Sequence, residues 1–151
     1  MINYTPRLFE TDADIRRIGN GLLDCILPRA DWTHEAHLAA CLWLVRERPD
    51  IHLETKMRVI ISRYNESVGG VNDDTQGYHD TITHCFIRVV KRYLADCAAG
   101  MSLADAVNGL LKSPFGRKNV PLTYYSRSRL FSVAARRGFI LPDLVDLPEM
   151  G

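Results

Sequence analysis

The chain of 151 residues has the length of one ordinary domain, and we expect residues 1–151 to form a single helical domain. Its net charge of +1 argues against a general nucleic-acid-binding protein, which would carry a large basic excess. The longest uninterrupted apolar run, 38–45, is far shorter than the ~18 residues of a membrane-spanning helix, and the N-terminus lacks the pattern of a signal peptide. These features predict a cytoplasmic protein with no membrane partner.

The first half of the chain contains three predicted helices. Apolar residues recur at helical spacing over 12–26, which predicts an amphipathic helix there. A second helix begins at Asp31 or Thr33, either of which can cap it, and ends before Pro49. Because this helix is apolar on nearly every side, we expect it at the centre of the domain. A third helix spans 52–68 and is ended by two glycines.

The fourth predicted helix covers 76–97. Its apolar stripe includes His79 near one edge, so this imidazole is expected to point inward. Asp80 and His84 fall on the opposite face and are interpreted as a solvated pair one helical turn apart.

The rest of the chain is more irregular. Residues 102–112 form a fifth predicted helix, and Ser126 and Ser132 have the positions of caps for short pieces of helix. Pro142 and Pro148 predict an extended C-terminal tail. The fold expected from these elements is all-α: an up-and-down helical bundle of about four to five helices with that tail lying over it.

Three histidines are the principal candidate site. His34 and His37 lie three residues apart on one face of the second helix, and an up-and-down bundle would bring its first turns beside His79 of the fourth. Tyr64 and Asn65, at the end of the third helix, are expected to reach the same place and to orient a ligand.

Helix N-termini favour neutral imidazole, the form that binds metal ions. Three histidines with an open fourth position are typical of a catalytic zinc site and can also hold iron or manganese. We therefore predict one divalent metal (Zn, Fe or Mn) at His34, His37 and His79. Two alternatives stay open: hydrogen-bonded structural histidines in the core, or a ligand or acid–base site without metal.

A basic segment is the second candidate. Residues 106–142 contain seven Lys and Arg and no acid, whereas 143–151 contain three acids, which leaves 1–105 at −3. Arg127 and Arg136 are predicted to bind a small anionic molecule, because guanidinium presents a planar fork to a carboxylate or phosphate. The alternative is that the basic segment packs on the acidic body of the domain.

The segments 32–38 (WTHEAHL), 77–83 (GYHDTIT), 125–136 (YSRSRLFSVAAR) and 142–144 (PDL) carry a resemblance. With them the chain resembles a family of small bacterial helical proteins of unknown function, over about 31–148. The resemblance implies a helical fold and marks the same histidines, but it supplies no activity, substrate or cofactor. The sequence leaves open whether the protein is an enzyme. The competing hypothesis is a non-catalytic interaction module or homodimer with buried structural histidines.

Overall fold

The computed structural model describes residues 5–149, and within them the chain is helical with no strand. The five long helices are α1 (Asp12–Leu23), α2 (His34–Glu47), α3 (Leu53–Ser67), α4 (Asp80–Ala95) and α5 (Leu103–Lys112). The short ones are η1 (Arg29–Asp31), η2 (Pro114–Gly116), α6 (Pro121–Tyr124), α7 (Arg127–Leu130) and α8 (Val133–Arg137). The prediction of an all-α helical bundle is confirmed. None of these helices is long and apolar enough to cross a membrane.

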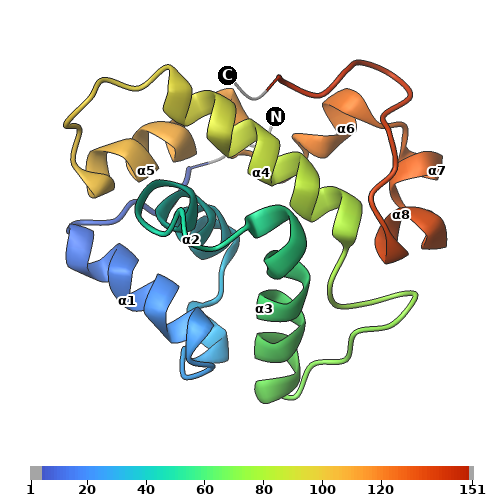
Figure 1. Ribbon diagram of the computed structural model, residues 1–151, viewed down its shortest axis with the longest axis horizontal. Coiled ribbons are helices and arrows are strands. Elements are labelled where there is room, and N and C mark those ends of the chain that lie inside the picture. The colour runs from blue at the N-terminus through green and yellow to red at the C-terminus, as the bar shows by residue number, and fades with distance from the viewer. Residues whose placement is uncertain (1–4, 150–151) are drawn as a thin grey trace.

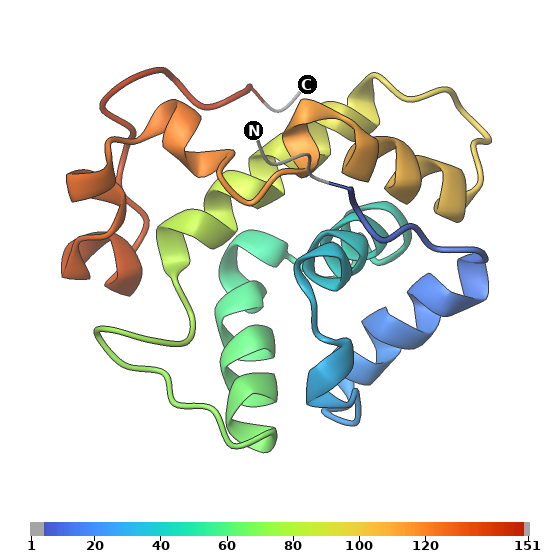
Figure 2. The same ribbon diagram turned by 180° about the vertical axis from the view of Figure 1, so that it is seen from behind.

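Helix α2 lies at the centre, as its apolar sequence predicts. Every residue from Leu38 to Leu44 is buried, and the helix packs against α1, α4 and α5. Figures 1 and 2 show α2 nearly end-on, whereas α3 and α4 lie close to the plane of the picture. Because α2 crosses α4 rather than running beside it, helix direction alone does not bring their first turns together.

The predicted caps of α2 and α5 are confirmed, whereas the predicted start of α4 differs. Thr33 accepts a hydrogen bond from the Ala36 amide and caps α2, and Ser102 caps α5 in the same way. Helix α4, however, begins at Asp80 rather than at 76. Gly77 adopts φ +80°, a left-handed conformation that ends any helix, and a Cβ there would meet the Val71 carbonyl oxygen.

The interpretation of Asp80 and His84 as a solvated pair is wrong. The two side chains do pair, with Nε2 of His84 3.6 Å from Asp80, but Asp80 is only 7% exposed. Its carboxylate accepts a 2.6 Å hydrogen bond from the Tyr78 hydroxyl and lies 3.2 Å from the Arg58 guanidinium. Arg58 belongs to α3, so the burial of Asp80 depends on a contact between two helices that periodicity cannot show.

Residues 117–149 form a cap over one end of α4 (Figure 1). Ser126 and Ser132 cap α7 and α8, as predicted. The tail runs back along these short helices, where Asp143 accepts hydrogen bonds from Ser126. Part of the basic segment packs on acidic parts of the domain, since Arg137 pairs with Asp74. These contacts place the end of the basic segment against the loop that precedes α4.

Candidate functional site

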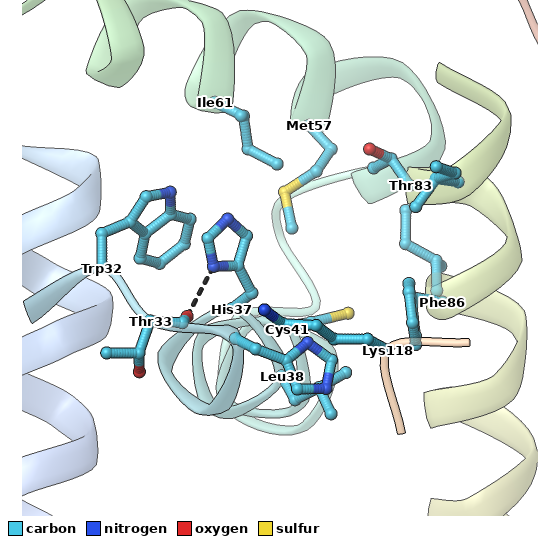
Figure 3. Close-up of a pocket in the computed structure, with 13 residues that line it drawn as sticks. Trp32, Thr33, His37, Leu38, Cys41, Met57, Ile61, Thr83, Phe86 and Lys118 are labelled. Carbon is cyan, nitrogen blue, oxygen red and sulfur yellow. Dashed lines mark hydrogen bonds between the residues drawn. The ribbon is translucent and has the colours of Figure 1, made fainter. Parts of the chain in front are cut away.

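A cavity of about 530 Å³ lies between α2, α3 and α4 (Figure 3). The apolar part of its wall is contributed by Trp32, Leu38, Cys41, Met57, Ile61, Ile82, Phe86 and Ile87. Its polar part consists of Thr33, His34, His37, Thr83 and Lys118. This volume and this mixture of side chains are typical of a site for a small organic molecule.

His37 is the most constrained polar group of the cavity. Its Nδ1 lies 2.6 Å from the Thr33 carbonyl oxygen, and its ring stacks on Trp32 with centroids 3.8 Å apart. A carbonyl can only accept, so Nδ1 carries the proton and donates it. In Figure 3 the other ring nitrogen, Nε2, points across the cavity towards Met57 and Ile61. Nε2 has no hydrogen-bond partner among residues 5–149.

The surroundings of His37 keep it neutral. Desolvation by the protein around the ring lowers its pKa from 6.5 to about 4, and the nearby His34 and Lys118 act in the same direction, against the bond to Thr33. The residue is nevertheless exposed to solvent. That accessibility weakens the desolvation but does not change its direction, so His37 is a neutral imidazole at neutral pH.

His34 contributes a second fixed imidazole to the wall. Its Nε2 donates to the Gly116 carbonyl oxygen at 2.7 Å, a contact that joins α2 to η2 across 82 residues of sequence. The ring also meets Phe86 edge-on, with centroids 6.1 Å apart. Its Nδ1 therefore carries the lone pair, and no residue in 5–149 donates to it.

Lys118 supplies the cationic group of the wall. It follows η2, so the contact between Gly116 and His34 holds its backbone near the mouth of the cavity. Its side chain is exposed and forms no ion pair or hydrogen bond with any residue of 5–149. Figure 3 shows it extending beneath His37, in agreement with its electrostatic effect on that ring. Among residues 5–149, no aspartate or glutamate lines the cavity.

Cys41 is a wall residue rather than a nucleophile. Burial raises the pKa of its thiol to about 12, so the reactive thiolate is not formed at neutral pH. The sulfur atoms of Cys41 and Met57 give the apolar wall a polarisable surface that adapts to different shapes.

His79 lies outside the cavity wall and uses both of its ring nitrogens. Nδ1 accepts a hydrogen bond from the Ile82 amide at 3.1 Å and caps α4, while Nε2 donates to the Leu130 carbonyl oxygen at 2.8 Å. Burial lowers its pKa. The structure thus brings His34 and His37 to one cavity and places His79 in the joint between α4 and α7. Within residues 5–149, no group of three or more His, Cys, Asp or Glu side chains is arranged to hold a metal ion.

The other predicted ligand-binding residues also lie outside the wall. The Tyr64 hydroxyl donates to the Leu27 carbonyl oxygen at 2.8 Å, and its buried ring makes an edge contact with Trp32. Asn65 donates to Asn72 at the end of α3.

Neither predicted arginine reaches the cavity. Arg127 is exposed on α7. Arg136 donates to the carbonyl oxygens of Gly77 and Tyr78, 2.9 and 3.4 Å away, and so holds the turn before α4. The cation at the cavity is instead Lys118, which the sequence marks only as one member of the basic segment.

A scan against models of protein families found no match, and searches of curated proteins and of solved structures found none either.

Proposed function

We propose that this protein binds a small organic anion with an apolar body in the cavity between α2, α3 and α4. The observation that carries the proposal is the composition of the wall: the described part of the chain contributes eight apolar side chains, one ammonium group without an ion pair in that part, and no carboxylate. Burial of an apolar body against the wall supplies binding free energy, at roughly 25 cal/mol per Å² removed from water. Lys118 then selects an anion over a cation or a neutral molecule.

The volume supports a ligand about the size of a bicyclic aromatic acid. A suitable probe is 2-naphthylacetate, whose ring system is apolar and whose carboxylate stands on a short arm. We expect the ring system to lie among Met57, Ile61 and Phe86, and the carboxylate to meet Lys118. The methyl ester of the same acid is the matched neutral probe.

Isothermal titration calorimetry with a cavity-filling variant tests this proposal. Ile61→Trp places an indole in the cavity, whereas Val59→Trp places one on the exposed side of the same helix, where Val59 is 56% exposed. We expect saturable 1:1 binding of 2-naphthylacetate to the wild type and to Val59→Trp, and none to Ile61→Trp. Equal binding to both variants would contradict the proposal.

A divalent metal held by His34, His37 and His79 is the second candidate. It is supported by the ring nitrogen that His34 and His37 each keep clear of hydrogen bonds to residues 5–149. It requires His79 to give up its bonds to Ile82 and Leu130. Elemental analysis of untagged protein, purified without chelators or a nickel column, tests it. About one equivalent of metal per chain, lost in a His34→Ala/His79→Ala variant, is the result that it predicts.

A further inference from the structure

We infer that the ligand carries a hydrogen-bond donor beside its anionic group, and that His37 Nε2 receives this donor. The inference rests on the proposed binding of an organic anion and names its class: an apolar 2-hydroxy acid. The carboxylate would meet Lys118 and the hydroxyl on the neighbouring carbon would meet His37.

His37 can only accept a hydrogen bond at Nε2. A neutral imidazole has one N–H, and the Thr33 carbonyl oxygen, 2.6 Å from Nδ1, takes that hydrogen. The same oxygen also accepts from the backbone amide of His37 at 3.0 Å, so both bonds come from one residue at the start of α2. Nε2 is left with a lone pair and no hydrogen.

The lone pair of His37 Nε2 also has a fixed direction. Trp32 lies against one face of the ring, 27° from parallel, and the bond to Thr33 fixes its rotation. Turning the ring over would break that bond. The Nε2 lone pair is therefore preorganised, and it faces the cavity across from Met57 and Ile61 (Figure 3).

A ligand without a hydrogen-bond donor loses binding free energy at His37. In the unliganded cavity water reaches His37, because the ring is accessible to solvent. An apolar ligand displaces that water and leaves Nε2 facing Met57 and Ile61, which cannot donate a hydrogen bond. Sites of this kind reject an analogue that lacks the required polar group.

The hydrogen-bond donor of the ligand is expected next to its anionic group. Lys118 extends beneath His37 and acts electrostatically on that ring. A carboxylate held by Lys118 therefore lies close to the His37 ring. We expect a hydroxyl on the adjacent carbon to reach Nε2 along the edge of that ring.

Calorimetry with three matched acids tests the inference: 2-naphthylglycolate, which has the hydroxyl; 2-naphthylacetate, which lacks it; and the α-methoxy acid, which blocks it. We expect the better enantiomer of the hydroxy acid to bind about three- to tenfold more tightly than the other two, the ratio of one neutral hydrogen bond. His37→Phe keeps a ring beside Trp32 and should abolish this ratio. The matched variant His52→Phe, at an exposed histidine, should keep it.

The outcomes separate this inference from the proposed function. If 2-naphthylacetate binds and the hydroxy acid binds no more tightly, the inference is overturned and the proposed function stands. A ratio that persists in His37→Phe overturns it as well. If none of the three acids binds, the proposed function fails and the inference fails with it.

A measurement on the wild type covers the case in which His37→Phe does not fold. In the saturated hydroxy-acid complex the ¹⁵N chemical shift of His37 Nε2 should stay in the hydrogen-bonded range, whereas in the saturated 2-naphthylacetate complex it should move towards the range of a lone pair without a partner. Equal shifts in the two complexes would overturn the inference.

Discussion

His37 and His79 occupy similar positions, each near the start of a long helix, but they differ in what their second nitrogen does. The cavity histidine has one nitrogen bonded to a backbone carbonyl and one pointing into open space. The joint histidine has both nitrogens bonded to backbone, one to an amide and one to a carbonyl. A buried polar group with all partners in the protein serves the fold, whereas one with a position left over is available to a ligand. The two regions should therefore respond to substitution in opposite ways.

The largest effect is expected at the joint. His79→Ala removes the cap of α4 and leaves the Leu130 carbonyl oxygen unpaired, so the free energy of unfolding should fall by about 2–4 kcal/mol. Urea unfolding followed by circular dichroism measures it. His52→Ala, at an exposed position, is the control and should change stability by no more than about 0.5 kcal/mol. Folded His79→Ala should still bind 2-naphthylacetate, and loss of binding with the fold intact would break the comparison.

Lowering the pH should reduce the difference in unfolding free energy between the wild type and His79→Ala. The folded protein lowers the pKa of His79 below its ordinary 6.5, so the unfolded chain takes up a proton at a higher pH than the folded one. The stability that neutral His79 contributes is present above pH 6.5 and is lost as the pH falls through its folded pKa. Unfolding curves of both proteins at a series of pH values below 6.5 should therefore converge, and a constant difference would be the contrary result.

At the cavity, substitution of Lys118 should lower ligand affinity and leave the free energy of unfolding nearly unchanged. Lys118→Ala removes an exposed cation with no ion pair in the described chain, so the unfolding free energy should stay within about 0.5 kcal/mol. Its affinity for 2-naphthylacetate should fall by about three- to tenfold, and the affinity for the methyl ester should not change. Lys112→Ala, at an exposed lysine on α5, is the matched control. An equal loss in both lysine variants would point to general charge attraction instead.

The smallest effect is expected at Tyr64, which contacts the cavity residue Trp32 but lies outside the cavity wall. Tyr64 stands behind Trp32, and Tyr64→Phe removes only its 2.8 Å hydrogen bond to the Leu27 carbonyl oxygen. Stability should fall by about 1 kcal/mol, whereas ligand affinity should be unchanged because the ring still supports Trp32. A clear loss of affinity would mean that the hydroxyl itself takes part in the site, as the sequence had suggested.

The sequence could predict those features that depend on residues close together in the chain. The caps at Thr33, Ser102, Ser126 and Ser132 depend on a side chain and an amide three residues apart, which is local information. The burial of α2 follows from its composition.

The features that were missed depend on contacts between distant segments. Lys118 belongs to the site because Gly116 meets His34, 82 residues earlier in the chain. Asp80 is buried where Tyr78 and the α3 residue Arg58 meet its carboxylate. His79 was expected inside a helix, but the left-handed turn at Gly77 makes it the cap instead. No periodicity reports such a turn, and helix direction then fails to bring His79 to the other two histidines.

The most direct test of the account is a long-range ¹H–¹⁵N correlation spectrum of the imidazole rings at neutral pH. We expect opposite tautomers: His37 protonated at Nδ1 with its lone pair at Nε2, and His79 protonated at Nε2 with Nδ1 accepting from a backbone amide. A His37 ring protonated at Nε2 would remove the acceptor from the cavity and contradict the account at its centre.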